Sequence, residues 1–154
     1  MKTVMWRILA LTLLVVILIG TLCGCGAKSD IDKTLSSFES ACHSLDVRGV
    51  IECLDPALSD PVLTVLDLIG VDDTSGALDA LVDKLNVFGN AGVSTEEFME
   101  SLKIKADEYE FSDDKTACDV RAEFQYGTGE EPHTMDVTIH MIKVDDGWYI
   151  SSIR

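Results

Sequence analysis

The apolar positions of the chain divide it into an N-terminal apolar run, a helical half and a strand-like half. Residues 8–22 are almost entirely apolar. Over residues 31–102 apolar side chains recur every three or four positions, which is the period of one helix face. From residue 103 onward they alternate with polar ones, as the two faces of a strand require. The pattern predicts an α+β fold, in which N-terminal helices pack on a curved antiparallel sheet of about four strands.

The helical half contains capping signals as well as periodicity. The segments that carry it are residues 31–44, 46–54, 61–69, 77–88 and 95–102. Asp30, Asp46 and Ser94 are the expected N-caps, and Glu97 is the expected reciprocal partner of Ser94 in a capping box. Pro61 is expected in the first turn of its helix, where proline is tolerated.

The alternating pattern from residue 103 onward also predicts the faces of the strands and the turns between them. Cys118 to Tyr126 alternate between apolar and polar positions, which indicates a half-buried strand. The last hairpin pairs apolar with apolar residues if its loop has three residues, with Val144 opposite Trp148 and Ile142 opposite Ile150. That register requires a bulge near His140, or else a sheet that is apolar on both faces.

The N-terminal run has the form of an export signal. Lys2 and Arg7 precede the apolar residues, and small residues follow them. The run ends in Leu22-Cys23-Gly24-Cys25, which resembles the bacterial lipobox. The resemblance implies a signal peptide over residues 1–24, lipidation of Cys25, a tether over residues 25–30 and one domain over residues 31–154.

Three other interpretations of this end stay open. The segment can be an ordinary signal peptide with incidental cysteines, or an uncleaved membrane anchor extended to Gly26. Cys23 is a weaker candidate for the modified residue, because Gly20 would then occupy the position of the lipobox leucine. If Cys25 is lipidated, the expected location is the bacterial cell membrane, with the domain outside the cytoplasm and held by a tether of at most about 18 Å.

The charge of the chain limits its partners. Without the signal peptide, ten Lys and Arg face 27 Asp and Glu, a formal net charge of −17. The phosphates of nucleic acids and of anionic lipid headgroups would be repelled. We therefore expect no nucleic-acid partner and no direct adsorption on an anionic membrane.

Cysteines and acids outside the signal give few candidate sites. Cys42 and Cys53 are spaced either for a disulfide or for two free buried thiols. The acidic pairs Asp72-Asp73 and Asp145-Asp146 lack the ligand spacing of an EF-hand loop. We expect no metal site and no cofactor.

A family resemblance follows from the order of these elements. Helices followed by a sheet, and a last hairpin reading IHMIKVDDGWYISSI, resemble the NTF2-like superfamily, and within it the small bacterial lipoproteins catalogued as DUF4878 or DUF5105. The resemblance implies a half-cone, often with a pocket at its open end and often a dimer. Phe38, Tyr126 and Trp148 are the residues expected to line such a pocket, although Trp148 fits a core anchor better than a stacking surface.

No motif selects a catalytic residue, so we expect a non-catalytic module that binds a small hydrophobic ligand or an envelope protein through the cone pocket or the outer sheet face. Two alternatives remain. One is a structural homodimer of the cell envelope. The other is a weak isomerase or lyase with Asp119 or Asp136 as base, which would need that carboxylate in an apolar pocket. His140 fits a hydrogen-bonded edge residue better than a catalytic one.

Overall fold

The computed structural model describes residues 26–69 and 93–154 of the chain. Cys25, the signal segment and the candidate helix at 77–88 lie outside the described residues. The described part contains a helix over residues 26–43, called here the N-terminal helix, and seven labelled elements. They are α2 (Val47–Glu52), α3 (Pro56–Ile69), α5 (Thr95–Ser101), β1 (Lys103–Phe111), β2 (Ala117–Tyr126), β3 (His133–Val144) and β4 (Gly147–Ile153).

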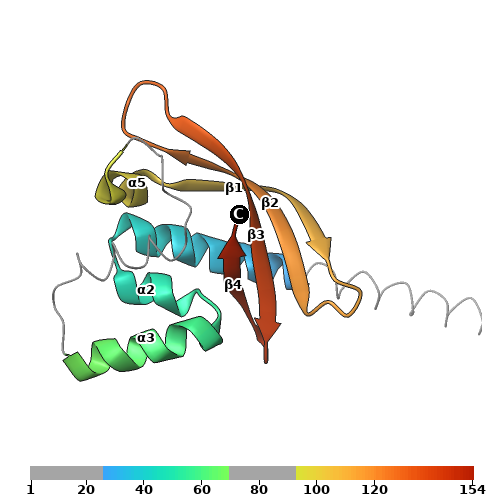
Figure 1. Ribbon diagram of the computed structural model, residues 1–154. Helices are drawn as coiled ribbons and strands as arrows, with labels where there is room; N and C mark the ends of the chain where they lie inside the picture. Colours follow the sequence, from blue (N-terminus) through green and yellow to red (C-terminus); the bar gives the residue numbers. More distant parts are fainter. Residues whose placement is uncertain (1–25, 70–92) are drawn as a thin grey trace, which may run out of the picture.

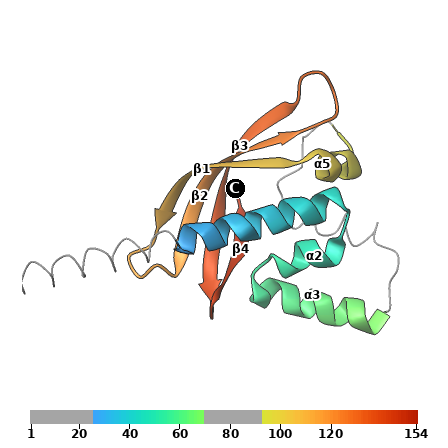
Figure 2. The same cartoon turned by 180° about the vertical axis from the view of Figure 1, so that it is seen from behind.

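The four strands form one antiparallel sheet in the order β1-β2-β3-β4. The sheet is bent, and the N-terminal helix lies across one of its faces (Figure 1). Seen from behind, α2 and α3 stack beyond this helix, on the side away from β1 (Figure 2). The predicted α+β architecture is therefore confirmed.

The core fills the space between the N-terminal helix and the sheet. Phe38 from the helix, Phe98 from α5 and Phe124 from β2 are among its largest fully buried side chains. The alternation predicted for β2 is confirmed, because Cys118, Val120, Ala122, Phe124 and Tyr126 are all buried. Removing any one large side chain of this core would cost about 3–5 kcal/mol.

Caps fix the connections between the helices. Asp46 caps α2, where its side chain accepts a hydrogen bond from the backbone N–H of Gly49 at 3.0 Å. Ser94 caps α5 by accepting from the N–H of Glu97 at 3.1 Å. The Glu97 carboxylate accepts a hydrogen bond from Thr128 at 3.0 Å. Asp46 and Ser94, two of the three predicted N-caps, are confirmed, whereas within the described residues the Glu97 carboxylate bonds to Thr128 and not back to the Ser94 N–H, as the predicted capping box required.

Two helix boundaries differ from the prediction. The N-terminal helix already includes residues 26–30, so Asp30 lies inside it and the expected extended tether is helical over these residues. Pro56 begins α3 with Asp55 before it, and Pro61 lies inside the helix. Pro61 removes the hydrogen bond to the carbonyl of Ala57. Ala57 and Pro61 are both exposed, so water can take the place of this hydrogen bond at the Ala57 carbonyl.

The two edges of the sheet are covered in different ways. On β4, Ile150 exchanges backbone hydrogen bonds with Cys53 and Asp55, both at 2.9 Å. On β1, the Glu39 carboxylate accepts from the N–H of Ile104 at 2.7 Å. These contacts occupy edge groups that would otherwise be free to pair with another strand.

The last hairpin corrects the predicted register. Lys143 pairs with Trp148 and Val144 with Gly147, so the loop is Asp145–Asp146, and Asp145 has φ 52°. The bulge expected near His140 is present, but the extra residue is Ser151 of β4 and β3 keeps its alternation. The register of β4 places Trp148 and Ile150 in the core. The free energy gained by burying these side chains outweighs what apolar pairing across the strands would contribute.

The outer face of the sheet is largely polar, so a sheet that is apolar on both faces was a wrong alternative. Cross-strand ion pairs join Lys105 to Glu123 at 3.5 Å and Arg121 to Glu108 at 2.9 Å. Within the described ranges, no helix combines the length and hydrophobicity needed to cross a bilayer.

Candidate functional site

The residues expected to line a cone pocket belong to the core. Phe38 is 2% exposed and Tyr126 8%, and the Tyr126 ring packs against Phe98 with 4.7 Å between centroids. Trp148 is 4% exposed and meets the ring of Phe111 edge-on at 5.9 Å. Phe38 and Tyr126 therefore act in packing, and Trp148 is a core anchor that also borders the groove described next.

A groove of about 780 Å³ lies outside this core, between the N-terminal helix, α2 and the β3–β4 hairpin. We call it the helix groove. Polar residues of the N-terminal helix form its longest wall: Asp30, Lys33, Thr34, Ser36, Ser37, Ser40 and Ser44. The opposite walls come from Asp46, Gly49, Glu52 and Cys53 at α2 and from Asp146, Gly147, Trp148 and Tyr149 at the hairpin.

Local structure explains why α2 forms a wall. The chain reverses at Leu45, which has φ 52° and donates its N–H to the carbonyl of Cys42 at 3.0 Å. Asp46 then caps α2, and Gly49 faces the N-terminal helix, where an added Cβ would lie 3.1 Å from the Cβ of Ala41. The absence of a side chain at Gly49 allows α2 to approach the N-terminal helix closely.

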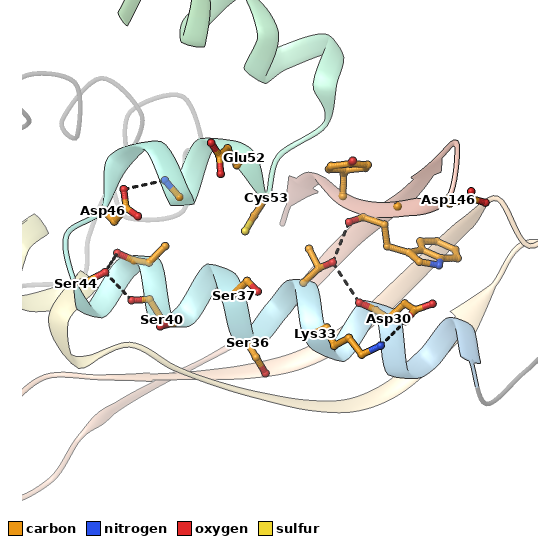
Figure 3. Close-up of a pocket in the computed structure, with 16 residues that line it drawn as sticks. Asp30, Lys33, Ser36, Ser37, Ser40, Ser44, Asp46, Glu52, Cys53 and Asp146 are labelled. Atoms are coloured by element: carbon orange, nitrogen blue, oxygen red, sulfur yellow. Dashed lines mark hydrogen bonds and ion pairs between the residues drawn. The ribbon is translucent and has the colours of Figure 1, made fainter. Parts of the chain in front are cut away.

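The polar side chains of the groove divide into paired and unpaired groups. Lys33 forms an ion pair with Asp30 at 2.8 Å, and the Ser44 hydroxyl donates to the carbonyl of Ser40 at 3.0 Å. Ser36, Ser37 and Ser40 are exposed, and within the described part of the chain no partner engages their hydroxyls. Figure 3 shows these serines along the helix, between Asp30 at one end and Asp46 at the other. The groove thus offers hydroxyl groups and carboxylates to a ligand.

A second, smaller recess lies between the N-terminal helix and β1, and its charged side chains and its tyrosine are already paired. The Tyr109 hydroxyl donates to the carboxylate of Asp32, and Lys28 lies 4.5 Å from the centre of the Tyr109 ring. Burial raises the pKa of Tyr109, and the hydrogen bond to Asp32 raises it further. These contacts hold the helix on the sheet.

The candidate bases lie away from the core. Asp136 is exposed, and Asp119 pairs with His140 across the outer face, with 2.5 Å between Oδ1 and Nδ1. Ser59 is the one buried polar residue among the residues that the structure describes. In that part of the chain the isomerase alternative therefore lacks its buried carboxylate, and His140 is a hydrogen-bonded residue of the sheet.

Over the residues that the structure describes, the cysteines and acids form no metal or disulfide centre. Cys42, Cys53 and Cys118 are buried free thiols, so the structure has no bridge between Cys42 and Cys53. Burial raises the pKa of Cys42 to about 12, and the nearby Cys53 and Glu39 add to the shift. No group of three or more metal-ligating side chains occurs over residues 26–69 and 93–154.

Sequence reasoning missed the helix groove, because its walls are far apart along the chain. Ser36, Ser40 and Ser44 recur every four residues on the polar side of the first helix, where charged residues are more usual. This spacing is a signal in the sequence, although it does not identify the opposing wall.

Comparisons with known proteins address the fold. No protein-family model and no curated protein matches the chain. Among solved structures, the chain is similar to an NTF2-like protein of unknown function from Shewanella oneidensis MR-1, with a TM-score of 0.52 and 15% identity over 82% of this chain and 95% of that one. A SEC-C motif-containing protein from Rhodopseudomonas palustris matches with a TM-score of 0.45 and 13% identity over 75% of this chain and 70% of that one. The chain therefore has an NTF2-like fold, and a fold alone does not define a function.

Proposed function

We propose that the protein is a non-catalytic, lipid-anchored lipoprotein of the bacterial cell envelope that binds its ligand in the helix groove, outside the cytoplasm. The single observation that carries the binding role is the groove itself, a concavity of about 780 Å³ outside the packed core, with hydroxyl and carboxylate side chains in its lining. Its exposed hydroxyl and carboxylate groups are suited to binding a polar ligand.

The anchor is supported by the N-terminal sequence, where Leu22 precedes Cys25 at the end of the apolar run. Lipidation with two or more acyl chains would hold the protein stably on a bilayer. The chain is helical from residue 26, and the groove begins at Asp30. Four residues of helix rise only about 6 Å, so the groove would open close to the membrane surface.

The anchor is tested by two cysteine variants expressed in a bacterium that processes lipoproteins. Cys25→Ala should remain unprocessed or be released, and Cys23→Ala should mature and stay with the membrane. Mass spectrometry should find the acyl chains on Cys25 of the wild-type protein. Cys25→Ala protein that matures and still partitions into the detergent phase would refute the anchor.

The binding role is tested by a photo-crosslinking amino acid placed in the full-length chain. At Ser40, on the groove wall, it should give a discrete adduct in living cells. At Glu110, which is exposed on β1, it should give none. Absence of any adduct at Ser40, or the same adducts at both positions, would contradict a role for the groove.

A further inference from the structure

The lining of the helix groove is acidic. The lining contains four acidic residues and one cation, Lys33, which gives it a formal charge of −3. The acidic residues are Asp30, Asp46, Glu52 and Asp146. All four carboxylates are exposed, and Lys33 is already paired with Asp30. A ligand that complements this lining therefore carries positive charge.

The charges are separated along the groove. Figure 3 shows Asp30 and Asp146 near the hairpin, Asp46 at the opposite end and Glu52 on the α2 wall between them. From Asp30 to residue 43, where the helix ends, the wall is a continuous helix, and at 1.5 Å per residue it is about 20 Å long. An extended polypeptide covers this length with about six residues.

The middle of the groove distinguishes a peptide from a simple polycation. The hydroxyls of Ser36, Ser37 and Ser40 each donate and accept hydrogen bonds. A peptide backbone offers both N–H and C=O groups to such a wall, whereas a protonated polyamine offers donors alone.

We propose that the helix groove binds an extended segment, about six residues long, of a basic polypeptide. Basic side chains at the two ends of the segment pair with the carboxylates at the two ends of the groove, and the serines bind the backbone between them. A second copy of this chain is a poor occupant, because its own formal charge is −15 even with the signal segment included. The proposal rests on the proposed function and names the ligand class of the same site.

Fluorescence anisotropy with defined peptides tests this proposal on the full-length lipoprotein in detergent. The probe is a labelled hexapeptide of glycine and serine with a lysine at each end, and its control has glutamates in place of the lysines. At low salt the lysine peptide should bind at least about tenfold more tightly than the control. Its affinity should fall as the ionic strength rises to about 150 mM. Equal binding of the two peptides, or no binding, would overturn the proposal.

Matched double variants locate the site. Asp46→Asn with Asp146→Asn should weaken the lysine peptide about tenfold, and asparagine preserves the cap on α2. Glu110→Gln with Asp136→Asn removes the same charge from the sheet and should leave the affinity unchanged. Circular dichroism checks that both proteins are folded. An equal loss in the two double variants would mean non-specific attraction and would overturn the assignment to the groove.

Ser40→Val separates a peptide from a small cation. It should weaken the lysine peptide severalfold and a linear polyamine clearly less, because the serine hydroxyl can both donate to and accept from a peptide backbone but can only accept from a polyamine. A polyamine that binds as tightly as the peptide and loses the same affinity in Ser40→Val would overturn the peptide assignment.

The two proposals can fail separately. Adducts at Ser40 in cells, together with no binding of the lysine peptide, would retain the groove as a binding site and refute its basic ligand. Specific peptide binding without any adduct in cells would support the ligand class and refute the cellular role.

Discussion

The hydroxyl of Thr34 donates a hydrogen bond to the backbone carbonyl of Trp148, with 3.0 Å between the oxygens. The two residues are 114 positions apart, and both line the helix groove. The bond joins the N-terminal helix to β4 at the point where the two walls meet. It therefore helps to set the width of the groove as well as the packing of the core.

Replacing Thr34 by valine tests this contact. Thr34→Val keeps the branched shape and removes the donor, so the free energy of unfolding should fall by about 1 kcal/mol. Urea unfolding measures the loss, and amide exchange should show weaker protection in β4. Thr64→Val is the control, because among the described residues the one partner of the Thr64 hydroxyl is the Asp60 carbonyl within α3. Equal unfolding midpoints for Thr34→Val and the wild type would refute a structural role.

Replacing Gly49 by alanine should not stabilise the protein, although this change usually stabilises a helix. Glycine to alanine commonly stabilises a helix interior by about 1 kcal/mol. Here the new Cβ would lie 2.6 Å from Oδ2 of Asp46 and 3.1 Å from the Cβ of Ala41. Gly49→Ala should therefore disturb the cap and separate the helices, for a net loss of about 1 kcal/mol.

Thermal unfolding distinguishes the environment of Gly49 from a general effect of alanine. Gly26 is also helical, and apart from its neighbours along the helix no atom of the described residues lies within 4 Å of a Cβ built there. Gly26→Ala should be neutral or stabilising. A higher melting temperature for Gly49→Ala would show that the contact with Asp46 relaxes without cost.

Local signals in the sequence predicted the local structure well. Asp46 and Ser94 were recognisable as caps because a short polar side chain preceded an apolar period. The faces of β2 followed from alternation alone. These features depend on residues close in sequence, so the pattern contains the needed information.

Features that depend on distant residues were predicted less well. The hairpin register was wrong because burial of Trp148 against Phe111 outweighs apolar pairing with Val144. The helix groove brings Ser40 and Asp146 to one concavity. No local pattern connects these two residues, so the site could not be derived before the fold.

Lys115 adopts a backbone conformation that favours glycine. It has φ 57° in the β1–β2 loop, and its side chain is exposed. The left-handed conformation costs an L-residue about 1–2 kcal/mol. Lys115→Gly should therefore stabilise the protein. The net gain is about 0.5–1 kcal/mol once the greater conformational entropy that glycine loses on folding is subtracted. Asp113→Gly, in the same loop at ordinary φ, should not stabilise it, and a gain in both variants would contradict this explanation.

The buried thiols should make the protein sensitive to alkali. Burial raises the pKa of Cys42 to about 12. The pKa of Cys53 is raised to about 11, mainly by burial and in addition by the negative charges of Glu52 and Asp46. For Cys118, burial followed by the charge of Asp119 also raises the pKa to about 11. The ordinary value of 9.0 applies to the unfolded chain, so above pH 9 the folded state holds protons that the unfolded state releases. Stability is therefore fully present below pH 9 and is lost as the pH rises toward about 11–12.

Melting temperatures measured from pH 8 to about pH 11 test this linkage. The wild type should lose stability across the range, and Cys42→Ala should lose less of it, whatever its melting temperature at pH 8. His43→Ala serves as the control, because it removes the hydrogen bond from Nε2 to the Leu102 carbonyl, 2.5 Å long, without removing a thiol. It should lower stability and leave the alkaline slope unchanged. If Cys42→Ala and the wild type have the same slope, the thiol is not responsible for the alkaline loss.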